Sequence, residues 1–317
     1  MRILREDDVR EALDMAACID ACERAFIAYS TGGAELPGVI HLDVPESDGE
    51  IHVKAGHLHG APYYAVKVAS GFSGVDPPAI DGMVAVFDAR DGAPAAFLLD
   101  NGYITDLRTG AAGGVAAQHL APTGVRTVGV IGTGGQARQQ LAALALVRPG
   151  FLHVRVWGRD AERAARCVED LRERLGPGRS VEAAAKARDA VEDADVVITC
   201  TAAREPLVMR EWLKPGAHVT AVGSDGEGKQ ELDPAILRVA DVVVVDSLDQ
   251  CRRLGELQHA PDIGAVELGL VCNGSSPARK SDEQLTVCDL TGLGAQDVAA
   301  ANVVMQRAGA RGERLQI

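Results

Sequence analysis

The stretch that most constrains this chain is a glycine-rich turn between two apolar segments. It spans residues 125–137 and reads Val-Arg-Thr-Val-Gly-Val-Ile-Gly-Thr-Gly-Gly-Gln-Ala. The residues from Val125 to Ile131 are typical of a buried strand, and leucines recur at helical spacing after the turn. Gly132 permits a tight turn, Gly134 lets phosphate approach the backbone, and the following helix start offers N–H donors. The pattern predicts a dinucleotide site, and the alternative is an ordinary tight turn.

After this turn, apolar strands alternate with helical segments. Helical patterns such as residues 160–175 fill the gaps between strand-like runs at 125–131, 152–157, 195–200, 217–222 and 241–246. Strands that alternate with helices form parallel sheets with helices on both faces. We therefore expect an α/β fold with a Rossmann doubly wound parallel sheet.

The first third of the chain has a different order of predicted helices and strands. A helical stripe over residues 5–31 precedes strand-like runs at 39–44, 51–55, 63–70, 83–87 and 95–99, and helical patterns follow at 106–120 and 294–309. Strands without interleaved helices favour a mixed or antiparallel sheet. We expect an N-terminal α+β substrate and dimerisation domain at 1–121, with 294–317 packing back on it, and a dinucleotide-binding Rossmann domain at 122–293.

Charge and cysteine usage exclude several functions. The net charge of −13, from 45 acids and 32 bases, argues against non-specific nucleic-acid binding and against an anionic membrane surface. No secretory leader and no apolar run long enough for a membrane helix is visible. The seven cysteines form no CxxC pair, and Cys18 and Cys22 share a helix face without further ligands nearby. We expect a cytoplasmic protein with no metal, nucleic-acid or membrane partner.

Four blocks carry a family resemblance, at residues 100–121, 128–137, 222–233 and 289–297. Together they resemble the ornithine cyclodeaminase/mu-crystallin family over essentially the whole chain. The segments HVKAG (52–56) and RRLGEL (252–257) are most similar to its ectoine-utilisation branch. The resemblance implies a homodimer, an NAD(P) cofactor and a small amino or imino acid as substrate.

The resemblance also implies roles for two charged residues. Asp225 follows a predicted strand end, where ligands of such sheets bind, and the matching family residue orients the substrate amine or relays its proton. The alternative is a turn aspartate that caps the next helix. Lys67 interrupts an apolar strand and matches a lysine at the substrate carboxylate. The alternative is a lysine that faces solvent.

Further residues are expected to contact the cofactor. Arg108 matches a family arginine that binds cofactor phosphate or substrate carboxylate, since its planar fork suits either anion. Lys229 matches a lysine near the cofactor, or is a solvated turn lysine. The block match places Thr291 at the substrate, and the remaining cofactor contacts are expected from Thr109, Gly132, Thr133, Gly134, Gly135, Gln136, Gly158, Arg159, Thr201, Ala202, Gly223 and Gly292.

Departures from the family indicate the substrate. Where the cyclodeaminase proper has a glutamate for the ornithine ammonium, this chain has His52, and an apolar position two residues on is Lys54. Strand alternation puts both on one face. The imidazole of His52 and the added ammonium of Lys54 would repel a dibasic amino acid. A pocket that holds Lys54, Lys67 and Arg108 would suit a substrate with two carboxylates. The alternative is that Lys54 faces water.

The cofactor and the reaction follow from these features. Gly158 and Arg159 stand where NAD sites usually carry an acid, which favours NADP(H) over NAD(H). Asp160 is the alternative acid, or only a helix cap. The resemblance and these departures together predict an imine reductase or amino-acid dehydrogenase for an acidic substrate, and the resemblance to the ectoine-utilisation branch implies a role in ectoine or hydroxyectoine breakdown. The alternatives are a cyclodeaminase that recycles its hydride and a mu-crystallin-like ligand-binding protein.

Overall fold

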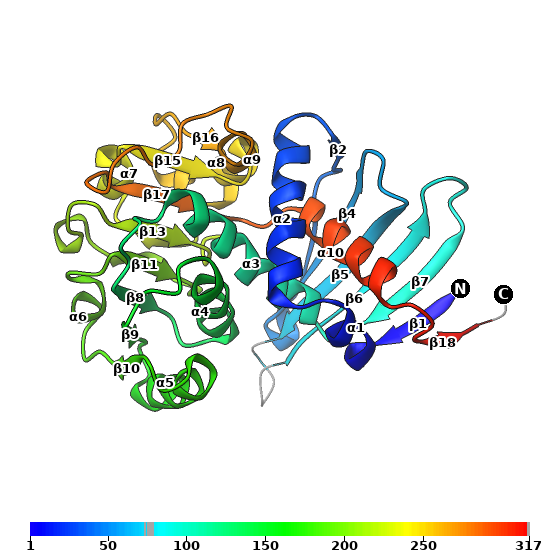
Figure 1. Cartoon of the computed structure of the whole chain (residues 1–317), viewed down its shortest axis with the longest axis horizontal. Coiled ribbons are helices and arrows are strands. Elements are labelled where there is room, and N and C mark those ends of the chain that lie inside the picture. The colour runs from blue at the N-terminus through cyan, green and yellow to red at the C-terminus, as the bar shows by residue number, and fades with distance from the viewer. Residues whose placement is uncertain (73, 75–78, 316–317) are drawn as a thin grey trace. The chain divides into compact units, whose positions relative to one another are not determined.

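The structure is a computed structural model that describes residues 1–72, 74 and 79–315, and it divides into two compact units (Figure 1). The first unit comprises Met1–Arg108 and Leu293–Ile317, and the second Thr109–Gly292. The expected boundaries at 121/122 and 293/294 differ from this division mainly in residues 109–121. These group with the second unit because Ala117 and Ala121 are buried in its apolar core.

The first unit contains a mixed sheet. Its strand order is β18 (Glu313–Arg314), β1 (Arg2–Arg5), β7 (Pro94–Leu99), β6 (Ala79–Asp88), β5 (Tyr63–Phe72), β4 (Gly49–Leu58) and β2 (Ala34–Glu35), and β3 (Ile40–Val44) also pairs with β4. The β1–β7 pair is parallel and the other pairs are antiparallel. The strands follow the alternating apolar runs, so the expected mixed sheet is confirmed.

Helices α1 (Glu6–Ala12), α2 (Met15–Ser30) and α10 (Gly294–Arg307) belong to the same unit. The single helix expected at 5–31 is two helices, because Asp14 caps α2 by accepting a 2.8 Å hydrogen bond from the Ala17 N–H. Figure 1 shows α2 and α10 beside each other, and α10 packs on β4 and β5. Side chains that alternate toward this face, such as Ala65, Lys67 and Val84, are therefore buried.

The second unit contains the expected parallel sheet. Its strand order is β10 (Ser180–Ala183), β9 (His153–Trp157), β8 (Thr127–Ile131), β11 (Val196–Thr199), β13 (His218–Ala221), β17 (Thr286–Asp289), β15 (Val242–Val245) and β16 (Val266–Glu267). All its pairings are parallel. A separate parallel pair joins β12 (Arg204–Val208) and β14 (Gln230–Leu232).

Helices cover both faces of this sheet, which is the doubly wound arrangement. They are α3 (Tyr103–Leu120), which crosses the unit boundary, α4 (Gly135–Val147), α5 (Ala161–Leu175), α6 (Ala187–Val191), α7 (Pro234–Val239), α8 (Leu248–Leu254) and α9 (Leu268–Cys272). One apolar core joins Val128 and Val130 to α4 and α5, and another joins Ile131 and Val197 to α6 and α7. Within the described residues we find no helix long and apolar enough to cross a membrane.

Candidate cofactor and substrate sites

The glycine turn of the second unit is built for a close approach by a ligand. Gly132 has a φ of 129°, and a Cβ there would lie 2.8 Å from the carbonyl oxygen of Cys200. Gly134 is the N-cap of α4 and offers no side-chain cap, and a Cβ on it would meet nothing within 4 Å. The start of α4 therefore lies open to the approach of a phosphate, which helix N-termini attract.

A cavity of about 560 Å³ opens beside this turn. Six of the expected cofactor residues line it: Gly132, Thr133, Gly134, Gly158, Arg159 and Thr201. Its other lining residues are Trp157, Asp160, Arg163, Cys200, Ala203, Arg204, Glu205 and Leu207. Gly135 and Gln136 open α4 directly after Gly134. The cavity has the position and the donors that a dinucleotide requires.

Three arginines and two acids, Asp160 and Glu205, line the cavity. The arginines are Arg159, Arg163 and Arg204. Asp160 caps α5, since its Oδ1 accepts the N–H of Glu162 at 2.9 Å and of Arg163 at 3.0 Å. These backbone N–H groups, that of Arg163 foremost, hold the pKa of Asp160 below its ordinary value. Asp160 is therefore a helix cap that also lines the cavity, and whether it contacts the cofactor stays a prediction.

Two residues that were predicted to contact the cofactor, Thr201 and Gly223, donate hydrogen bonds to the buried carboxylate of Glu231. The carboxylate of Glu231 accepts hydrogen bonds from the Thr199 hydroxyl, from both the N–H and the hydroxyl of Thr201, and from the Gly223 N–H at 2.9 Å. Sequence reasoning missed Glu231, whose role depends on contacts between β14 and the ends of β11 and β13. The hydrogen bonds of Glu231 hold the residues that follow β11 and β13 in place. Ala202, another predicted cofactor residue, is exposed to solvent.

Thr291 and Gly292 donate hydrogen bonds to another buried carboxylate, that of Asp246. Asp246 Oδ2 accepts their N–H groups at 2.9 and 2.6 Å, and Oδ1 accepts the Thr291 hydroxyl at 2.9 Å. Neither residue lines the cavity. Thr109, on α3, accepts a hydrogen bond from Gln140 at its carbonyl oxygen. The structure thus gives these three residues bonds within the protein, and their ligand roles stay predictions.

Asp225 lies on the loop after β13, at the carboxyl end of the sheet. Its side chain is 45% exposed, and its Oδ1 accepts a hydrogen bond from the Lys229 Nζ at 2.7 Å. The element after the loop is the strand β14, so the interpretation of Asp225 as a helix cap is wrong. The strand-end position places this carboxylate at the edge of the sheet where ligands of such folds bind.

The first unit gathers buried charges on the helix-covered face of its sheet. Lys67 on β5 and Asp297 on α10 are each 2% exposed, and the Lys67 Nζ donates to Asp297 Oδ1 at 3.0 Å. The Arg108 Nε donates to the same oxygen at 3.1 Å. The solvent-facing interpretation of Lys67 is therefore wrong. Sequence reasoning missed Asp297, although an acid in the apolar run of α10 was a signal for a buried partner.

Lys54 and His52 lie on this face by register. Lys54 on β4 pairs directly with Lys67, so the two side chains share a face and Lys54 is only partly exposed. His52 is two residues away, its Nε2 lies 3.8 Å from a Glu50 carboxylate oxygen, and its ring meets that of His41 edge-on at 4.6 Å. The sheet thus brings Lys54 toward Lys67, while His52 has an acid of its own as neighbour.

Burial and charge set the protonation of the cluster formed by Lys54, Lys67, Arg108 and Asp297. Burial lowers the pKa of Lys67 to about 7, although the charge of Asp297 opposes this. Burial would raise the pKa of Asp297, but the Lys67 and Arg108 charges hold it below its ordinary value. Asp100 is also buried, and its pKa is raised to about 6. Lys67 therefore exchanges its proton near neutral pH while Asp297 stays charged.

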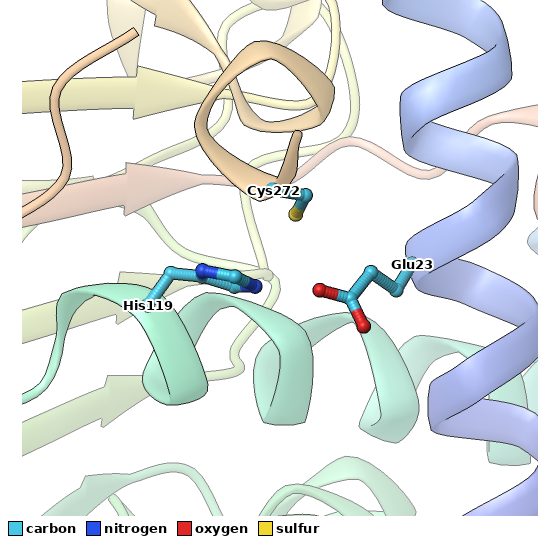
Figure 2. Close-up of side chains that lie close together, drawn as sticks. All are labelled: Glu23, His119 and Cys272. Carbon is cyan, nitrogen blue, oxygen red and sulfur yellow. The ribbon is translucent and has the colours of Figure 1, made fainter. Parts of the chain in front are cut away.

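Three potential metal ligands are drawn in Figure 2: Glu23 on α2, His119 on α3 and Cys272 at the end of α9. His119 and Cys272 belong to the second unit and Glu23 to the first. Two ligands from one unit fall short of the three or four that protein zinc sites use. The absence of a metal stays a prediction.

The fold defines a two-unit α/β protein of the dinucleotide-binding class. The family model described as ornithine cyclodeaminase/mu-crystallin family matches residues 1–312, and the chain belongs to this family. It is thus an enzyme, an NAD(P)-dependent oxidoreductase or cyclodeaminase. A relative from Sinorhizobium fredii, called uncharacterized cyclodeaminase y4tK, is 42% identical over 321 residues, which cover 97% of this chain and 96% of the relative.

Two solved structures are similar over nearly the whole chain. An archaeal alanine dehydrogenase dimer with bound NAD has a TM-score of 0.90 at 34% identity and covers 100% of this chain and 99% of its own. The iminosuccinate reductase of Paracoccus denitrificans with NAD⁺ has a TM-score of 0.87 at 30% identity and covers 97% and 96%. The family resemblance and the Rossmann fold are confirmed, and the ectoine-utilisation branch stays a prediction.

Proposed function

We propose that the protein is an imine reductase or amino-acid dehydrogenase that acts on the C–N bond of a small acidic amino or imino acid. The observation that carries this proposal is the group of three cations on one face of the first unit. There Lys67 and Arg108 both donate to the Asp297 carboxylate, and Lys54 pairs with Lys67 across the neighbouring strands. A substrate with two carboxylates would balance these charges.

The chemistry is a hydride transfer coupled to a proton transfer. A bound nicotinamide would accept or donate the hydride. Asp225 would orient the substrate nitrogen and take or return its proton, and Lys67 with Arg108 would bind the substrate carboxylate. The iminosuccinate reductase among the solved structures acts on an acidic imine by its name, which supports the proposed substrate class.

Two rival functions remain distinct proposals. A cyclodeaminase would return the hydride to its own intermediate, so cofactor would not be consumed, and the name of the Sinorhizobium relative supports it. A mu-crystallin-like binding protein would need cofactor and ligand sites but no proton-transfer group. The carboxylate of Asp225 and its bond to Lys229 weigh against that rival.

Further expectations belong to the same proposal. A second copy of the chain would cover the sheet face opposite α10, where Ile40, Leu42 and Val68 are exposed and Tyr64 stacks on Phe87 at 5.0 Å. The dimer among the solved structures supports this, and the mass of the protein in solution tests it. A cytoplasmic location and a role in ectoine or hydroxyectoine breakdown stay predictions.

The substrate class makes Lys54 a testable residue. Lys54→Met is expected to raise the KM for an acidic substrate about tenfold or more, the scale of one charge-assisted hydrogen bond, with kcat little changed. Steady-state kinetics with acidic imino acids measure this. Lys280→Met, which removes an exposed lysine of the second unit, is the matched control. An unchanged KM would show that Lys54 faces water and would contradict its role.

NADP(H) is the cofactor that we propose. The arginines Arg159, Arg163 and Arg204 around the cavity and the use of Asp160 as a helix cap support a 2′-phosphate site. Arg159→Ala is expected to weaken NADPH more than NADH by roughly 1–3 kcal/mol, as for hydrogen bonds to charged groups. Fluorescence titration measures both affinities, with Arg166→Ala, an exposed arginine on the following helix α5, as control. Equal losses for both cofactors would remove the 2′-phosphate role from Arg159.

A further inference from the structure

One carboxylate oxygen of Asp297, on α10, accepts hydrogen bonds from side chains on β5 and α3. This oxygen, Oδ1, accepts from Lys67, 230 positions away in the chain, and from Arg108, 189 positions away. The three side chains are at most 7% exposed. The other oxygen, Oδ2, is buried and has no hydrogen-bond partner among the described residues. A single carboxylate oxygen therefore fixes both the ammonium and the guanidinium.

Two further charges act on this pair. Lys54 faces it from β4, and its charge acts on both Lys67 and Asp297. Asp100 also acts on Lys67, and its Oδ2 accepts the Ile104 N–H at 2.7 Å. A buried cation is costly without a counter-ion, and Asp297 relieves that cost for both Lys67 and Arg108.

We propose that Asp297 is a positioning residue, which holds the Lys67 ammonium beside the Arg108 guanidinium and keeps Lys67 protonated for a ligand carboxylate. This role depends on the proposed function only through the identity of the ligand. Asp297 does not touch the ligand itself. It acts through the two cations whose donors it orients.

The proposal has a consequence for pH. Burial lowers the pKa of Lys67 to about 7, the charge of Asp297 raises it, and the charges of Arg108 and Lys54 lower it. On α2, Cys18 faces the cluster and stays neutral, because its pKa is raised well above the ordinary value by the neighbouring Cys22. A carboxylate ligand should thus bind more weakly as the pH rises through 7, and loss of the Asp297 charge should move this decline to lower pH.

Calorimetric titration of the whole protein from pH 5.5 to 9 tests this, with succinate and L-alanine as probes. In the wild type we expect each affinity to fall by up to tenfold per pH unit above about pH 7. In Asp297→Asn the midpoint should move down by about one unit or more, so that the loss is smallest at the acid end. Asp20→Asn, an exposed acid of the same unit, should leave the midpoint in place.

Other outcomes separate the possibilities. An equal loss at every pH with an unchanged midpoint would reduce Asp297 to a structural residue and overturn the proposal. If Asp297→Asn does not fold, Lys67→Arg replaces it: its guanidinium does not titrate, so the decline above pH 7 should vanish, and a persistent decline overturns the proposal. If the protein binds L-alanine but does not bind succinate, the acidic substrate class is contradicted and the role of Asp297 is not. Binding of neither probe would overturn both.

Discussion

Replacing Asp225 with asparagine is expected to lower turnover by about 100-fold or more, the lower range of general acid–base catalysis. The amide keeps the size of the side chain but cannot take a proton from the substrate nitrogen. The affinity for the cofactor should stay close to that of the wild type, since Asp225 does not line the cavity. Steady-state kinetics together with cofactor titration measure the two effects separately.

The folding of this variant should be nearly unaffected. The carboxylate is 45% exposed, and its ion pair with Lys229 contributes little to stability because solvent screens it. Glu227→Gln, an exposed acid on the same loop, is the matched control and should keep its turnover. Near-normal turnover in Asp225→Asn would remove this residue from the chemistry and leave the ligand-binding rival in place.

Replacing Lys67 with methionine is expected to abolish detectable binding of any amino acid, a loss of about 100-fold or more. One hydrogen bond between charged groups contributes roughly 1.5–3 kcal/mol, and the change also removes one of the two cations that donate to Asp297. Cofactor binding should persist, since all residues that line the 560 Å³ cavity belong to the second unit. Calorimetry with amino acids and with cofactor measures both.

The same variant should change how stability depends on pH. Burial lowers the pKa of Lys67 in the folded protein to about 7, from its ordinary value of 10.5. Between these values the unfolded chain binds more protons than the folded one, so Lys67 makes the free energy of unfolding rise with pH. Lys67→Met should remove that rise, by at most about 1.4 kcal/mol per pH unit. If urea unfolding of the two proteins shows the same pH dependence, Lys67 has an ordinary pKa.

Local sequence pattern predicted strands β8, β9, β11, β13 and β15 of the second unit, but not β10, β16 and the buried strand β17. The predicted strands are short runs of β-branched residues bounded by turns, as at Val196–Thr199 and Val242–Val245, and such runs are buried on both faces of a parallel sheet. The strand β10, at Ser180–Ala183, was missed because it is short and mostly exposed. The helix break at Asp14 was missed because the apolar stripe continues across it.

Contacts between distant segments could not be predicted in this way. Nothing in the residues around Asp297 indicates that its partners lie on β5 and α3, because a side-chain pattern records burial and not the identity of the neighbour. Glu231 and Asp246 were missed for the same reason. The glycine turn was found because its function depends on backbone conformation, which neighbouring residues largely determine.

The proposed reaction is tested by cofactor stoichiometry. Purified protein is mixed with acidic 2-oxo acids, ammonium and NADPH or NADH, and separately with ornithine and the oxidised cofactors, while reduced nicotinamide is followed by absorbance. We expect one reduced cofactor to be oxidised for each acidic amino acid formed, and ornithine to be inert. Conversion of ornithine to proline and ammonia without net change in the cofactor would contradict the proposed function and identify a cyclodeaminase.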